Sequence, residues 1–207
     1  MELGFHKFPS GKRYAYVMQD GRPVFLRNII FLTRGENIVL VREWGAPSDM
    51  HVWESPKGQM EWSEFAWAGI RAGSKQSQAL VMKCMKKAML REMVEEAKVM
   101  PSEIKHMRPL PLQYEQEWLN CDLKNSKFLY QFWTAELSSL SPAQKRMKTL
   151  VDNPDWKGIL PADLTEKDAV KWWKPADGWD HIRNGFSKKM MQQYFEFRMS
   201  QQSTDGI

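Results

Sequence analysis

Three glutamates crowd together near the end of a segment with helical character, where the chain reads Arg91-Glu92-Met93-Val94-Glu95-Glu96. At about 100° per residue, Glu92, Glu95 and Glu96 fall within a sector roughly 100° wide. Glutamates spaced i,i+3 and i,i+4 destabilise a helix by about 0.2–0.5 kcal/mol per pair, and the C-terminal end of the helix dipole disfavours anions. The spacing therefore gathers oxygen ligands on one face at a cost in helix stability.

This acidic face has two interpretations. A solvated surface is the commoner reason for a run of charges, and Arg91 and Lys98 offset part of the repulsion. A divalent cation would offset the repulsion directly, because carboxylate oxygens are the ligands that Mg²⁺ or Mn²⁺ prefers. The pattern alone leaves both interpretations open.

A second group of residues lies upstream, where Trp53-Glu54-Ser55-Pro56-Lys57-Gly58 is followed by Glu64. Gly58, five residues, Glu64 and then Arg91-Glu92-Met93-x-Glu95-Glu96-x-x-Val99 resemble the Nudix box, G-x5-E-x7-R-E-U-x-E-E-x-G-U with U apolar. The phrase at 53–58 is similar to the W-x-x-P-K-G of Nudix enzymes acting on diphosphoinositols, dinucleoside polyphosphates and capped RNA. The layout resembles the family over about 24–136, and the specific motifs lie at 53–64 and 88–99.

The chain departs from the box at two places. Twenty-six residues separate Glu64 from Arg91 where the box has seven, which we interpret as an insertion of nineteen residues at 65–83. A loop lengthens at modest entropic cost, because the cost grows only with the logarithm of length. Lys98 stands where the box has a glycine that helps the helix to end in a left-handed residue.

The resemblance implies a Mg²⁺-dependent (or Mn²⁺-dependent) pyrophosphohydrolase that cleaves a nucleoside diphosphate linked to another group. It implies that the metal ligands are the Gly58 carbonyl, Glu92, Glu95 and Glu96. Arg91 would pair with a carboxylate, Glu64 being the candidate, and fix its orientation. The implied catalytic set is then Glu64, Arg91, Glu92, Glu95 and Glu96.

The general base is open among several glutamates. Glu95 is our first candidate, Glu166 is a distant alternative, and Glu115 and Glu117 come after it. The activity is open as well, because an RNA 5′-cap hydrolase would share these motifs. A non-catalytic domain that only binds nucleotide or RNA is a third interpretation, although it would normally have lost a glutamate that this chain keeps.

Basic and aromatic residues are the candidates for substrate contacts. Residues 65–91 contain no Asp or Glu but carry Arg71, Lys75, Lys83, Lys86, Lys87 and Arg91. This basic strip is either a solvated face or a surface that meets phosphates beyond the pair being cut, as in a polyphosphate or RNA chain. We predict substrate contacts for Lys57, Lys83, Lys87 and Trp44, whose ring could stack on a base.

Composition sets the broader limits. The 207 residues are 43% hydrophobic with a formal charge of +5, which favours a folded protein and, weakly, anionic partners. Two cysteines make no disulfide framework, and we see no signal peptide or run of about 18 apolar residues, so we expect a cytoplasmic protein outside the membrane. The expected partner is a nucleotide or polyphosphate, or capped RNA; oligomeric state stays open.

The pattern of apolar residues predicts a mixed α and β chain. Strands are expected at 13–18, 24–33, 37–44, 106–114, 127–136 and 169–173, and helices at 77–98, 142–151 and 186–201. The last helix carries an apolar stripe of Phe186, Met190, Tyr194 and Phe197 for docking. We expect one α/β domain over 1–207, a Nudix-type α/β/α sandwich around a mixed sheet.

Overall fold

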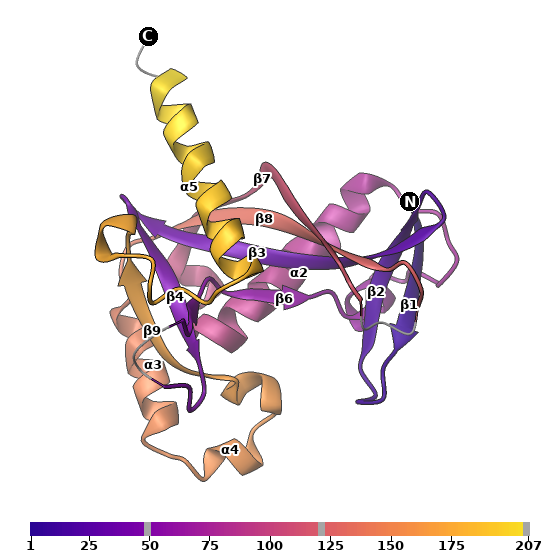
Figure 1. The fold of residues 1–207 in the computed structure, drawn as a ribbon. Coiled ribbons are helices and arrows are strands. Elements are labelled where there is room, and N and C mark those ends of the chain that lie inside the picture. The colour runs from indigo at the N-terminus through magenta and orange to yellow at the C-terminus, as the bar shows by residue number, and fades with distance from the viewer. Residues whose placement is uncertain (48–50, 120–122, 205–207) are drawn as a thin grey trace.

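Nine strands form one mixed sheet in the computed structural model, which describes residues 1–47, 51–119 and 123–204 (Figure 1). The strands are β1 (Glu2–Lys7), β2 (Arg13–Gln19), β3 (Arg22–Arg34), β4 (Asn37–Glu43), β5 (Trp53–Glu54), β6 (Lys57–Gln59), β7 (Ile104–Glu117), β8 (Lys127–Leu137) and β9 (Lys167–Trp173). The helices are α1 (Trp62–Ala66), α2 (Gln78–Ala97), α3 (Ser141–Val151), α4 (Trp156–Ile159) and α5 (Phe186–Thr204).

Strand β3 organises the sheet. It pairs antiparallel with β2, β4 and β6, and parallel with β8 over ten residues from Val24–Lys127 to Thr33–Glu136. Strand β6 pairs only with β3 among the described residues, so its other edge has no strand beside it. The candidate site lies at that edge.

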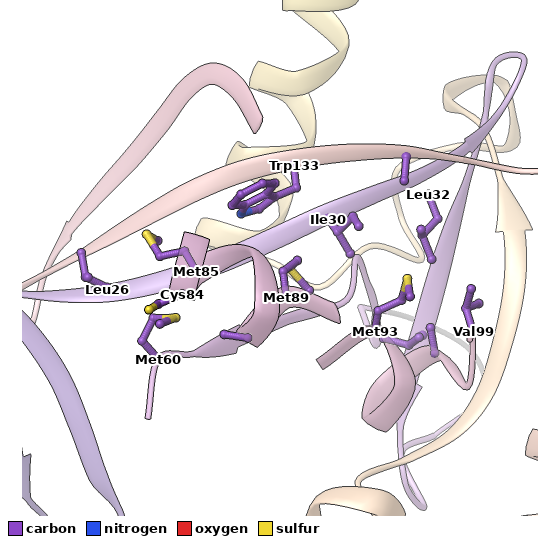
Figure 2. Close-up of a cluster of buried hydrophobic side chains, with 14 of the residues drawn as sticks. Leu26, Ile30, Leu32, Met60, Cys84, Met85, Met89, Met93, Val99 and Trp133 are labelled. Carbon is purple, nitrogen blue, oxygen red and sulfur yellow. The ribbon is translucent and has the colours of Figure 1, made fainter. Parts of the chain in front are cut away.

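Two hydrophobic clusters cover the two faces of β3, because successive side chains of a strand point to opposite sides. Leu26, Ile30 and Leu32 pack against α2 through its methionines Met85, Met89 and Met93 (Figure 2). Phe25, Ile29 and Phe31 pack on the other face with Met190 and Tyr194 of α5. The predicted sandwich, with helices on both faces of a mixed sheet, is therefore confirmed.

Helix α2 begins and ends at defined caps. The Ser77 hydroxyl accepts a hydrogen bond from the Leu80 amide at 3.3 Å, as an N-cap residue does. Lys98 ends the helix in the left-handed conformation with φ 58°. This conformation costs a residue with a side chain about 1–2 kcal/mol. The Lys98 ammonium donates to the Leu164 carbonyl at 2.6 Å and to the Glu95 carbonyl. The helix thus ends where the family's glycine would stand.

The predicted helices and strands are all present, within a few residues at each end. The stripe of α5 packs as expected, and Trp133 and Trp173 are buried. The strands β1, β5 and β6 and the helices α1 and α4 were not predicted. The last four of these contain five residues or fewer, too few to show a period. No helix in the described part of the chain is long and apolar enough to cross a membrane.

Replacing Trp133 with Phe should lower the free energy of unfolding by about 1–3 kcal/mol. The Trp133 indole donates to the buried Asn28 Oδ1 at 2.8 Å, and phenylalanine leaves that oxygen without its donor. Urea denaturation measures the loss, with Trp156→Phe at a 40% exposed site as the control. A Trp133 variant as stable as the control would contradict this account.

Candidate functional site

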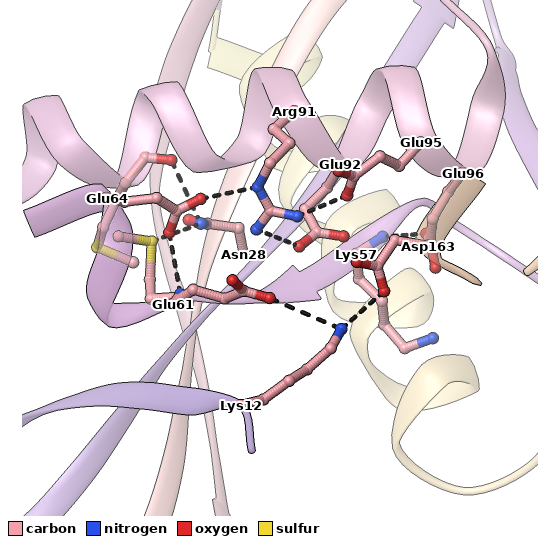
Figure 3. Close-up of polar contacts among 12 residues, drawn as sticks. Lys12, Asn28, Lys57, Glu61, Glu64, Arg91, Glu92, Glu95, Glu96 and Asp163 are labelled. Carbon is pink, nitrogen blue, oxygen red and sulfur yellow. Dashed lines mark hydrogen bonds and ion pairs between the residues drawn. The ribbon is translucent and has the colours of Figure 1, made fainter. Parts of the chain in front are cut away.

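Strand β6 and helix α2 bring the two sequence motifs into contact. A Cβ atom on Gly58 would lie 1.8 Å from the Glu92 Cδ, so any larger residue at this position would displace the Glu92 carboxylate. One residue earlier, the Lys57 amide donates to Glu96 Oε2 at 2.8 Å (Figure 3). The end of the WESPKG phrase therefore lies directly against the glutamates of α2.

Arg91 gathers three carboxylates around one guanidinium group (Figure 3). Its Nε donates to Glu64 Oε1 at 2.9 Å, its Nη2 to Glu92 Oε1 at 2.8 Å and its Nη1 to Glu95 Oε2 at 2.5 Å. The expected pair between Glu64 and Arg91 is thus present across the inserted segment. Each of these bonds occupies one oxygen of its carboxylate.

The insertion at 65–83 is fastened to the N-terminal strand. Backbone hydrogen bonds join Leu3 to Ser74 at 3.1 Å and Gly73 to Leu3 at 2.8 Å, and Ile70 is buried beneath them. The segment contains the end of α1, a series of turns and the first turn of α2. These bonds hold the middle of the segment against β1, and Glu64 and Arg91 meet despite their separation in sequence.

Four buried charges form a second network beside Arg91. Glu54 pairs with Lys57, and with Lys167 at 3.0 Å, while Lys167 also pairs with Glu96 at 3.2 Å. All four side chains are less than a tenth exposed. Burial lowers the pKa of Lys57, against the attraction of Glu54, whereas Lys57 and Lys167 lower the pKa of Glu54 against the effect of burial. Lys57 lines the site, but its ammonium is already paired.

The two networks border one cavity of about 160 Å³. Seven acidic and five basic side chains line it, which leaves an excess of negative charge. Burial, with repulsion from neighbouring glutamates and against the pull of Arg91, raises the pKa of Glu92 to about 8. The lining residues are Lys12, Tyr14, Arg27, Glu54, Lys57, Gly58, Gln59, Glu61, Arg91, Glu92, Glu95, Glu96, Asp163, Glu166 and Lys167.

The carboxylates are arranged around protein cations. No group of three or more carboxylate, imidazole or thiol side chains within the described residues is arranged to hold a metal ion. Glu92 and Glu95 each give one oxygen to Arg91, and Glu96 gives one oxygen to the Lys57 amide and the other to Lys167. The predicted metal ligands therefore share one cavity, while Arg91 and Lys167 balance part of their charge.

The other predicted substrate contacts, Lys83, Lys87 and Trp44, do not line this cavity. Lys83 and Lys87 are exposed on α2, about 140–180° around the helix axis from Glu92. Trp44 lines a second cavity of about 600 Å³, which shares Glu166 and Lys167 with the first. The substrate contacts of Lys83, Lys87 and Trp44 remain predictions.

The candidate general bases also differ in whether they line a cavity. Glu166 lines both cavities, and burial together with the charge of Glu96 raises its pKa. Glu115 and Glu117 lie outside both cavities, paired at 2.7 Å with Lys127 and Arg22 respectively. Of the four candidate bases, Glu95 and Glu166 therefore line the cavity of about 160 Å³, and Glu115 and Glu117 do not.

Several lining residues gave no signal in the sequence. Lys12 extends from the turn before β2 and pairs with Asp163 at 2.7 Å and with Glu61 at 3.6 Å (Figure 3). Arg27 and Gln59 face each other across β3 and β6. These residues share no motif and no fixed spacing, so only the pairing of distant segments brings them together.

Comparison with known proteins finds similarity in solved structures. No family model and no curated protein matches the chain. A NUDIX hydrolase from Nitrosomonas europaea is 12% identical over 83% of this chain and 88% of its own, with a TM-score of 0.42. An Ap4A hydrolase from C. elegans is 14% identical over 86% of this chain and 98% of its own, with a TM-score of 0.43. A pyrophosphohydrolase from Bacillus subtilis is 14% identical over 98% of this chain and 97% of its own, with a TM-score of 0.46. The similar structures are Nudix hydrolases, the family whose box the sequence resembles.

Without metal, the protein should lose stability as the pH rises from about 5 to about 8. Burial raises the pKa of Glu64 to about 7 and of Glu92 to about 8, from an ordinary value of 4.5. Between these values the folded chain retains protons that the unfolded chain has released, so the free energy of unfolding falls with pH. Urea denaturation of metal-stripped protein across this range measures the slope.

The Glu92→Gln variant should show a shallower fall, because glutamine carries no charge at any pH in the series. Glu36→Gln, at an exposed carboxylate in the turn between β3 and β4, should keep the parent slope. Stability that rises from pH 5 to 8 would contradict the raised pKa values.

The Glu64–Arg91 contact should appear as coupling in a double-mutant cycle. Glu64→Gln and Arg91→Met should each destabilise the protein, and the double variant should cost less than the sum by about 0.5–3 kcal/mol. The comparison pair is Lys148 and Asp152, an exposed i,i+4 ion pair at 2.8 Å, which should couple by only about 0.3–0.5 kcal/mol. Strict additivity for Glu64 and Arg91 would show that the contact contributes nothing.

Proposed function

We propose that this chain is a Nudix-type pyrophosphohydrolase that uses Mg²⁺ or Mn²⁺ to cleave a nucleoside diphosphate linked to another group. The observation that carries the proposal is the contact of Arg91 with Glu64, Glu92 and Glu95 beside Gly58. Both halves of the box meet there, although the insertion separates them in sequence. The proposal rests on these residues, and the fold shared with solved Nudix structures agrees with it.

The residues at the cavity fit a divalent cation in their chemistry. The side chains of Glu92, Glu95 and Glu96, with the Gly58 carbonyl, would supply the oxygen ligands. The raised pKa of Glu92 reflects negative charge that burial and its neighbours make costly, and a cation would relieve this cost. When bound, the metal would neutralise the pyrophosphate and lower the pKa of the attacking water.

The side chains of this chain would then position and deprotonate that water. Arg91 holds the carboxylates of Glu64, Glu92 and Glu95 in place, and Glu92 and Glu95 line the cavity, each with one oxygen that is not bonded to Arg91. Glu95 is the first candidate for the base, because it lines the cavity and burial raises its pKa towards neutrality. Glu166, with a raised pKa at the junction of both cavities, is the alternative.

The Glu95→Gln variant should lose at least about 100-fold in kcat, because general-base catalysis contributes about 10²–10⁴-fold. Mg²⁺ should raise the melting temperature of the parent protein, since a ligand that binds only the folded state stabilises it. Released phosphate or nucleotide is measured at saturating Mg²⁺. Glu117→Gln, outside both cavities, is the matched control. Undiminished hydrolysis in Glu95→Gln, or in metal-stripped protein, would refute the proposal.

A substrate panel separates this function from its alternatives. Dinucleoside polyphosphates, nucleotide sugars, nucleoside triphosphates and capped RNA are each incubated with the protein and Mg²⁺. Release of a cap nucleotide alone would identify an RNA 5′-cap hydrolase. Binding without hydrolysis of any compound would identify a non-catalytic nucleotide-binding or RNA-binding domain.

A further inference from the structure

Two buried nitrogen atoms on one wall of the cavity have no hydrogen-bond partner. They are Arg27 Nε and Gln59 Nε2, and both residues line the cavity of about 160 Å³. Arg27 of β3 lies directly opposite Gln59 of β6 in the antiparallel register. A buried donor without an acceptor costs about 1–3 kcal/mol, so two adjacent ones point to an acceptor from outside the chain.

Arg27 differs from the other cations of the cavity in its partners. Lys12 pairs with Asp163, Lys57 with Glu54, Lys167 with Glu54 and Glu96, and Arg91 with three glutamates. Arg27 has no carboxylate partner within the described residues. The charge of the Arg27 guanidinium is therefore able to pair with an anionic ligand.

Aromatic rings hold the Arg27 guanidinium in place. Its Cζ lies 4.8 Å from the centre of the Phe128 ring and 5.1 Å from that of Tyr130, both on β8. A stacked guanidinium is planar and oriented, and its parallel N–H groups match the oxygens of a phosphate. The wall therefore offers oriented donors before any ligand binds.

The edge of β6 separates this wall from the glutamates. Gly58 faces Glu92, whereas its neighbour Gln59 points to the opposite face with Arg27, because side chains alternate along a strand. The cavity includes residues from both faces, and β6 has no further strand beside it among the described residues. A ligand can therefore extend around this edge, from the carboxylates to Arg27.

We propose that Arg27 and Gln59 form a subsite for a phosphate group of the substrate other than the two joined by the scissile bond. This inference rests on the proposed function, which places the scissile pyrophosphate at the glutamates. It identifies the substrate class as nucleotides with a chain of three or more phosphates, in preference to nucleotide sugars, which carry two.

Direct binding tests the subsite without catalysis. Inorganic triphosphate is titrated calorimetrically into protein stripped of metal on a chelating resin. Arg27→Met keeps an apolar stem against the rings and removes the charge, and it should raise the Kd at least about tenfold. Gln59→Leu should raise the Kd about fivefold, as expected for one uncharged hydrogen bond.

Arg22→Met is the matched control. Arg22 begins the same strand, pairs with the exposed Glu117 and lies outside the cavity, so its loss should change the Kd less than about twofold. Arg27→Lys keeps the charge without the planar fork and should fall between the parent and Arg27→Met. Melting temperatures of all variants show that they are folded. Equal losses in the Arg22 and Arg27 variants, or no binding by the parent, would overturn the subsite.

Kinetics test the substrate class. Arg27→Met should raise the KM for a dinucleoside tetraphosphate or a nucleoside triphosphate about tenfold and leave the KM for a nucleotide sugar within about twofold. Equal effects on both would overturn the assignment to an additional phosphate. If no compound is hydrolysed, the proposed function fails, and the triphosphate titration still decides whether Arg27 and Gln59 bind phosphate.

Discussion

The buried ion pairs among Glu54, Lys57, Glu96 and Lys167 are the contacts on which the site depends. They connect four elements, namely β5, β6, α2 and β9, and each buried charge has an oppositely charged partner in the network. Removing one partner from such a network typically costs about 3–5 kcal/mol, because it leaves an uncompensated buried charge. The network therefore fixes β6 against α2, and Gly58 meets Glu92 as a consequence.

The charge of the cavity follows from that placement. Arg91 balances part of the charge of three glutamates, and Lys167 balances part of that of Glu54 and Glu96. Burial, together with the remaining excess of negative charge, raises the pKa of Glu92. Arg27 of β3 lies beside Gln59 of β6 on the opposite face of the sheet, without a carboxylate partner among the described residues. Strand β6 thus separates the anionic wall of glutamates from the cationic wall that contains Arg27. This arrangement suits a ligand with several phosphates.

Much of this architecture could be predicted from the sequence because its signals are local. The apolar period and Ser77 predicted α2, and the alternation at 127–136 predicted β8. The box residues, read with an insertion at 65–83, predicted that Glu64 would meet Arg91, and the two are 2.9 Å apart. The short strands β5 and β6 could not be predicted, since two or three residues show no periodicity.

By itself, then, the sequence determined the residue types on the acidic face, the helix that carries them and the resemblance to a known box. The tertiary structure alone decided that Lys57 pairs with Glu54, that Lys83 and Lys87 lie on the outer face of α2, and that Arg27 and Gln59 share a wall. The reason is physical. A helix places its own residues by a fixed rotation, whereas the register between β3 and β6 depends on packing between segments about thirty residues apart.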